Sequence, residues 1–190
     1  MRREAFISGL LIGLGAAGFL ALGGIPGAVI FAFGLIGVVL AGVPLYTGKA
    51  GVMTNIWQLL EIWFWNVVGC VTIGVLLKFS DVSYLTNAST IVEGRFSAGI
   101  LGSFLRAVGC GMIIDIAVYL YRKSGSLLPV IFGVPLFILC GFYHSIADVV
   151  YLTASWRWDN AILWYYPSIF LGNYVGCNVR RVILPKTKWI

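Results

Sequence analysis

Charged side chains are scarce in this sequence. Only 11% of the 190 residues are charged, whereas 60% are hydrophobic and the mean hydropathy is +0.96. Ordinary soluble domains carry about 25% charged residues. A soluble fold of this length has too little interior to hide so much apolar surface. The composition therefore excludes a soluble domain and predicts an integral membrane protein.

Residue types that ligate metals or carry out catalysis are also few. The chain has a single histidine, His144, and seven acidic residues, and none of its four cysteines forms a C-x-x-C pair. The cysteines lie within apolar runs, which is typical of small packing residues. We therefore expect no enzymatic activity, no metal site and no cofactor. No Asn-Pro dipeptide occurs, which argues against a water or glycerol channel.

Positive charge is concentrated where apolar runs end. The net charge of +6 follows this distribution, so we interpret it as the positive-inside pattern and not as a nucleic-acid surface. With both termini in the cytoplasm, the residues Arg2, Arg3, Lys49, Arg122, Lys123, Arg180, Arg181, Lys186 and Lys188 lie inside, and Lys78, Arg95 and Arg157 lie outside. We therefore predict a multi-pass protein of the cell membrane with cytoplasmic termini and lipid around it.

Six apolar runs are long enough to cross a bilayer. They cover about 6–22, 28–45, 56–79, 96–121, 127–152 and 162–182. The stretch 80–95 is too polar to form another span. We expect one all-α transmembrane transporter domain over residues 1–190.

The chain also repeats itself. The letters N-V-V-G-C at 66–70 return as N-Y-V-G-C at 173–177, and interruptions at 42–47 and 141–144 occupy the same relative place in the second and fifth runs. Halves of three spans each must have opposite topology. The pattern therefore predicts two inverted repeats, about 5–79 and 96–184, with a site at their interface.

The two interruptions carry the expected chemistry. A broken helix at membrane depth is tolerated where protein or a water-filled cavity receives its backbone groups, and the freed helix N-termini favour anions. Ordinary proline and glycine kinks are the alternative. His144 lies in the second break, aligned with Thr47 in the first. Asp148, four residues later, either favours the charged form of the histidine or braces the break.

These motifs resemble those of the formate/nitrite transporter family. The segment G-F-Y-H-S-I-A-D at 141–148 resembles the family's G-F-E-H-S-I-A-N, and L-Y-T-G at 45–48 resembles its L-F-T-G loop. F-L-R-A-V-G-C at 104–110 resembles the R-G-I-x-C-N region, and L-G-N-Y-V-G at 171–176 resembles G-N-x-x-G. The resemblance implies an aquaporin-like protomer with two broken helices. It also implies a homopentamer in which each protomer has its own pore for formate, nitrite, hydrosulfide, acetate or lactate.

The resemblance also implies roles for individual residues. The pore residues are His144, Thr47, Leu45, Phe137, Phe31, Leu35 and Asn173, with Arg95 as a basic vestibule residue. Departures from the family pattern are Tyr143, Asp148, Gly111 and Pro44. Despite these departures we expect the fold of the family, and the identity of the transported anion stays open.

Three functions remain in competition at this point. The first is transport of small monovalent weak-acid anions together with a proton, with His144 setting the pH dependence and Arg95 attracting anions as an exposed charge. The second is passive conduction of an anion such as hydrosulfide past a charged His144. The third is a membrane scaffold that transports nothing.

Overall fold

The computed structural model describes residues 1–80 and 82–183, and all regular elements in these ranges are helices. They are α1 (Arg2–Leu22), α2 (Gly24–Ala41), α3 (Tyr46–Lys49), α4 (Ile56–Lys78), α5 (Val82–Ser97), α6 (Gly99–Ser124), α7 (Leu128–Leu139), α8 (Ala147–Ser155) and α9 (Ile162–Ile183). Lys186 and Lys188 of the predicted cytoplasmic cluster, and the last residue of the second predicted repeat, lie outside the described residues.

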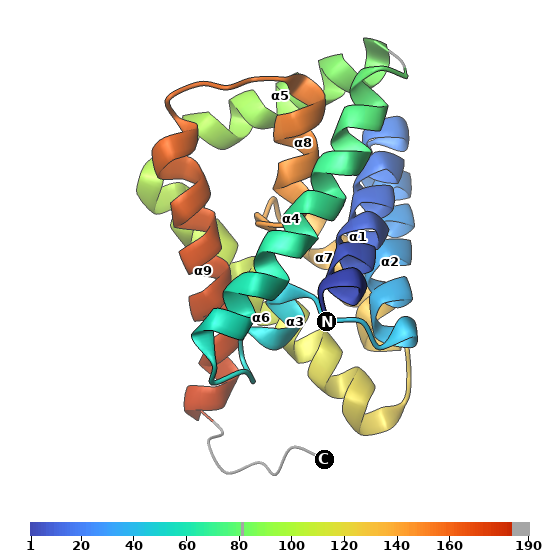
Figure 1. Ribbon diagram of the computed structural model, residues 1–190, viewed down its shortest axis with the longest axis vertical. Helices are drawn as coiled ribbons and strands as arrows, with labels where there is room; N and C mark the ends of the chain where they lie inside the picture. Colours follow the sequence, from blue (N-terminus) through green and yellow to red (C-terminus); the bar gives the residue numbers. More distant parts are fainter. Residues whose placement is uncertain (81, 184–190) are drawn as a thin grey trace.

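Four of these helices, α1, α2, α4 and α6, are long and apolar enough to cross a membrane. The fifth apolar run is divided into α7 and α8, and the second is divided into α2 and the short α3. Helix α9 has spanning length, but asparagine and arginine side chains lower its hydropathy. The polar stretch before the fourth run forms α5, which lies across one end of the bundle (Figure 1).

Glycines bring two helix pairs into backbone contact. Helix α1 packs on α4, and α6 packs on α9. A Cβ atom built on Gly69 would lie 2.4 Å from the carbonyl oxygen of Phe6, and one built on Gly176 would lie 2.2 Å from that of Val108. No side chain fits at either position. Within a bilayer no hydrophobic force drives helices together, so their association depends on close packing, which small residues permit.

The first break is held by the side chain of Asn66 on α4. Its Oδ1 accepts a hydrogen bond from the Tyr46 backbone N–H at 2.8 Å. Its Nδ2 donates to the carbonyl oxygens of Ala5, at 2.7 Å, and Pro44, at 3.1 Å. One amide thus satisfies backbone groups on both sides of the break, which would otherwise be buried without partners.

Asn173 on α9 holds the second break with the same set of bonds. Its Oδ1 accepts from the Ser145 N–H at 2.8 Å, and its Nδ2 donates to the carbonyl oxygens of Ala107, at 2.8 Å, and Tyr143, at 2.9 Å. Both side chains are fully buried. The repeated letters around Asn66 and Asn173 therefore correspond to a repeated structural task.

These bonds correct one detail of the sequence comparison. Asn66 bonds the residues that flank Leu45, whereas Asn173 bonds the residues that flank His144. The counterpart of His144 is therefore Leu45. The alignment of the breaks predicted Thr47 instead. The glycines that open the breaks have left-handed backbones and agree with this register. Gly42 lies three residues before Leu45, and Gly141 lies three residues before His144.

Candidate functional site

His144 lies in the break between α7 and α8, with only 3% of its surface exposed. Its Nδ1 accepts a hydrogen bond from the Ala147 backbone N–H at 3.1 Å, and its Nε2 lies 3.1 Å from Thr47 Oγ1. A nitrogen that accepts from an N–H carries no proton, so the ring proton resides on Nε2 and is donated to Thr47. The geometry therefore defines a neutral imidazole.

This arrangement limits what the imidazole can do. Charging His144 requires a proton on Nδ1, which would break the bond from Ala147 at the start of α8. Releasing the Nε2 proton instead would leave an imidazolate. In this geometry the ring is therefore a hydrogen-bond donor and has no spare proton to give.

Thr47 is the partner of the His144 donor. Its side chain is fully buried, and its carbonyl oxygen accepts from the Cys177 thiol with an Sγ–O distance of 3.0 Å. Because Thr47 Oγ1 accepts from His144, its own hydroxyl proton remains available for another acceptor. The histidine–threonine pair thus presents a polarised O–H within an apolar surrounding.

Aromatic rings enclose the histidine on one side. The rings of Phe31 and Phe137 meet edge to face with centroids 5.9 Å apart, and Phe137 also stacks on the His144 ring at 5.9 Å. Next to them is a cavity of about 40 Å³, here called the His144 cavity. It is lined by Phe19, Phe31, Arg95, Phe137, Ile138, Phe142, His144, Ala147, Asp148 and Tyr151. A space of this volume holds only a few water molecules.

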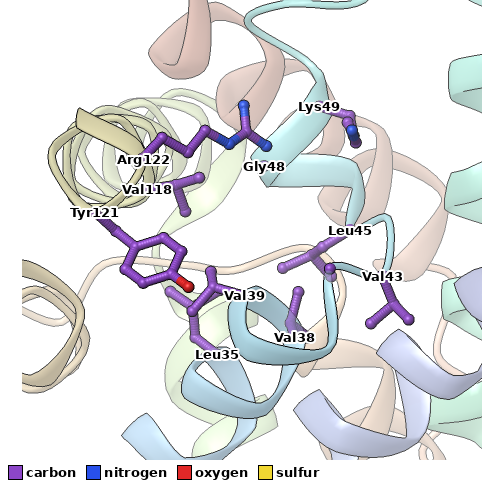
Figure 2. Close-up of a pocket in the computed structure, with 11 residues that line it drawn as sticks. Leu35, Val38, Val39, Val43, Leu45, Gly48, Lys49, Val118, Tyr121 and Arg122 are labelled. Carbon is purple, nitrogen blue, oxygen red and sulfur yellow. The ribbon is translucent and has the colours of Figure 1, made fainter. Parts of the chain in front are cut away.

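A second, wider cavity of about 370 Å³ reaches the first break, and we call it the basic cavity. Leu35, Leu45 and the neighbouring valines form its apolar side, and Arg122 and Lys49 lie apart from each other along its opposite rim (Figure 2). Its full lining is Leu35, Val38, Val39, Gly42, Val43, Leu45, Gly48, Lys49, Val118, Tyr121 and Arg122. Sequence reasoning counted Lys49 and Arg122 as topology signals and missed that they share a cavity.

Arg95 does not have the environment that the sequence predicted. We expected an exposed vestibule charge, but only 16% of its side chain is exposed, and its Nε lies 3.4 Å from Asp148 Oδ2. Its guanidinium carbon lies 3.8 Å from the centre of the Tyr143 ring. The last turn of α5 and the first turn of α8 pack together and enclose the arginine between a carboxylate and an aromatic ring.

Asp148 has its polar contacts with Arg95 and Tyr165. The Tyr165 hydroxyl donates a short hydrogen bond to Asp148 Oδ2. Asp148 and His144 line the same cavity, and the Asp148 backbone N–H bonds the His144 carbonyl oxygen at 2.9 Å. The structure thus brings His144, Arg95 and Asp148 together around one small space, and Thr47 joins them only through its contact with His144. Tuning of the imidazole by Asp148 stays a prediction.

A second buried ion pair is formed by residues that line neither the His144 cavity nor the basic cavity. Arg180 on α9 approaches Asp115 on α6 with Nε–Oδ2 and Nη2–Oδ1 distances of 2.6 and 3.1 Å. This two-point contact fastens the two helices to each other. Arg106 has a different partner, the Tyr143 hydroxyl at 2.7 Å.

Apolar helices, two breaks that meet at a shared polar centre and a cavity on each side of that centre define a membrane transporter or channel. The family model described as "Formate/nitrite transporter" matches residues 2–185, and the chain belongs to that family.

Individual relatives agree with this assignment. A probable formate transporter of Methanothermobacter thermautotrophicus is 27% identical over 90% of this chain and 82% of its own length. A formate channel of Bacillus thuringiensis is 26% identical over 90% of this chain and 78% of its own length. A solved pentameric formate channel with formate bound superposes with a TM-score of 0.84 at 19% identity, over 96% of this chain and 93% of that one.

Proposed function

We propose that this protein carries small monovalent weak-acid anions of the formate and nitrite class across the membrane, and that a proton travels with each anion. The observation that carries the proposal is the His144–Thr47 donor pair, which lies between apolar side chains at the meeting point of the two breaks. Named relatives that act on formate support the substrate class.

The proposed route runs from the basic cavity to the His144 cavity. Leu35 and Leu45 line the first cavity, and Phe31 and Phe137 line the second. The histidine–threonine pair lies between these two apolar constrictions. Asn173 keeps the second break in place by bonding the backbone on both sides of His144. This order supports a path in which a single polar site, the His144–Thr47 pair, lies between two apolar constrictions.

Desolvation favours a proton-coupled crossing over passive conduction. Moving an unpaired charge into an apolar passage costs several kcal/mol, whereas a neutral acid crosses at much lower cost. A permanently charged His144 would offset the charge of a passing anion, but it would lose its bond from Ala147. The neutral imidazole therefore supports a mechanism in which the anion crosses in its protonated form, as the neutral acid.

The proposed assembly is a homopentamer of six-span protomers built from two inverted repeats, with both termini cytoplasmic. The matched bonds of Asn66 and Asn173 support the repeats. The pentameric channel of similar fold supports the assembly. Native mass spectrometry of the purified protein should give five copies of the chain. A monomer or dimer under the same conditions would contradict this part of the proposal.

Flux into proteoliposomes tests the function. We expect formate and nitrite, but not divalent sulfate, to enter protein-containing vesicles faster than protein-free vesicles of the same lipid. With the membrane potential clamped by potassium and valinomycin, uptake should follow an inward proton gradient and acidify the interior. Uptake that follows the membrane potential without acidification would instead indicate the passive channel. No uptake above the protein-free vesicles would indicate the scaffold.

A further inference from the structure

We propose that Asp148 occupies the anion site of Arg95, and that a transported anion replaces it there only when Asp148 takes up a proton. The inference rests on the proposed function and names the residue that links the proton to the anion. It concerns the equilibrium of binding and is therefore testable without any measurement of flux.

Arg95 is the one cation among the residues that line the His144 cavity. Its charge is already compensated, because Asp148 Oδ2 lies 3.4 Å from its Nε and the Asp148 side chain is only 2% exposed. An anion that enters this space therefore meets a guanidinium with a carboxylate at its side. The attraction of the site for a second anion is weak as long as that carboxylate is ionised.

The pair is loosely made compared with the other buried ion pair. Asp115 and Arg180 meet through two contacts of 2.6 and 3.1 Å. In contrast, within the described part of the chain, neither Arg95 Nε nor Asp148 Oδ1 has a hydrogen-bond partner. A buried carboxylate oxygen without a donor is costly. These two atoms lie on residues that line a cavity, where a proton and a small anion have room to bind.

Two negative groups beside one guanidinium repel each other, and a proton on one of them relieves the repulsion. The binding step is then balanced: the Asp148 carboxylate takes up one hydronium-borne proton from the solution and becomes a carboxylic acid, and the anion pairs with Arg95. Transfer of this proton to the anion yields the neutral acid and restores the Asp148–Arg95 pair. The step requires no other reactant.

Other ionisable groups surround the Asp148 carboxylate. They are Arg95 on α5, Cys110 on α6, Tyr151 on α8, Tyr165 and Tyr166 on α9, and Tyr143 and His144 in the break. Phenols and thiols ordinarily keep their protons at neutral pH, and guanidinium keeps its charge. Nδ1 of His144 is occupied by a backbone N–H. Asp148 is therefore the group left to change its charge when an anion arrives.

Isothermal titration calorimetry of formate into the purified full-length protein measures this linkage. Between pH 6 and 8, in two buffers that differ in ionisation enthalpy, we expect about one proton to be taken up per anion. The affinity should accordingly weaken about tenfold per pH unit. Chloride serves as a second probe, because it accepts no proton at these pH values. Proton uptake with chloride would place the proton on the protein.

Asp148→Asn should bind formate with no proton uptake and with an affinity that stays constant over this pH range. The affinity at pH 8 should exceed that of the wild type. Asp148→Ser, with the same expectations, replaces it if the asparagine variant does not fold. Asp115→Asn is the matched control, because it removes a buried carboxylate from the other arginine pair, and it should retain the wild-type proton uptake.

Three results would overturn the inference. They are formate binding by the wild type without proton uptake, wild-type proton uptake in both Asp148 variants, and loss of proton uptake in His144→Asn. The absence of any formate or chloride binding to the wild type would overturn it as well. The flux assay answers a separate question, because linked binding without flux would contradict the proposed function alone. Flux without linked binding would contradict this inference alone.

Discussion

At the scale of single residues, the structure separates two roles that the sequence assigned to one histidine. His144 is the only histidine and lies at a break, so its titration near neutral pH was expected to set the pH dependence of transport. The Ala147 N–H bonded to Nδ1 and the Thr47 hydroxyl bonded to Nε2 make it a neutral donor instead. The carboxylate of Asp148 is the better candidate for the proton-linked group.

Replacing His144 by Asn tests the donor role. The asparagine oxygen takes the place of Nδ1 as acceptor for Ala147, but no donor reaches Thr47 any longer. A hydrogen bond between neutral groups contributes about 0.5–1.5 kcal/mol, so initial formate uptake should fall several-fold. The measurement is proteoliposome uptake at pH 6, with the pentamer verified by native mass spectrometry.

The same variant should keep the proton uptake that accompanies formate binding, because Asp148 is untouched. His144→Phe should block uptake by size. Uptake by His144→Asn equal to that of the wild type would mean that the histidine serves packing only.

The sequence located the residues of the site but not their contacts. His144, Thr47 and Asn173 stand out because they recur in a repeated pattern inside apolar runs. The contact between Arg95 and Asp148 has no such signal, because it depends on how α5 packs against α8. An arginine at the start of an apolar run is equally compatible with an exposed charge and with a buried ion pair.

At the scale of helices, the two breaks were predictable, but their register was not. Glycines and a proline interrupt the apolar runs, and this signal places the breaks. The lengths of the resumed helices differ, since α3 spans Tyr46–Lys49 whereas α8 spans Ala147–Ser155. Aligning the letters of such unequal segments paired His144 with Thr47. The bonds of the two asparagines pair it with Leu45.

Close helix contacts predict which glycines tolerate a side chain. In Gly176→Ala the new methyl group would meet backbone atoms of α6 at 2.2–2.9 Å, and a backbone cannot turn away as a side chain can. Overpacking of this kind costs about 1–3 kcal/mol. The variant should unfold at a lower temperature in detergent and yield less pentamer.

Gly94→Ala provides the matched control. Gly94 lies in α5 with no atom within 4 Å of a built Cβ, so alanine should leave the unfolding temperature unchanged or raise it. Equal effects of the two substitutions would show that the α6–α9 contact is looser than the structure indicates.

At the scale of the whole molecule, the charges on the two sides of the central site differ. Lys49 and Arg122 open onto the basic cavity and form no ion pair with any described residue. Arg95, on the other side, is compensated by Asp148. The sequence assigned anion capture to Arg95 and only topology to the other two. Lys49 follows the first break and Arg122 lies in the last turn of α6, so only packing reveals that they share a cavity.

Anion capture at the basic cavity should therefore depend on salt. Solvent-facing charges raise the local concentration of an oppositely charged solute. The reach of this effect falls from about 30 Å at 0.01 M salt to about 3 Å at 1 M. The double variant Lys49→Gln, Arg122→Gln should lower formate uptake several-fold at low ionic strength and subsaturating formate. The difference from the wild type should shrink as the ionic strength rises.

Lys123→Gln is the control for this prediction. Lys123 is exposed beside Arg122 and carries the same charge, but it does not line the cavity. If capture depends on the potential inside the cavity, Lys123→Gln should leave uptake near the wild-type level, because water screens a charge outside the cavity more strongly. A loss as large as that of the double variant would mean that only the overall positive surface matters. A loss in the double variant that persists unchanged at high salt would mean that Lys49 and Arg122 shape the cavity and do not attract the anion.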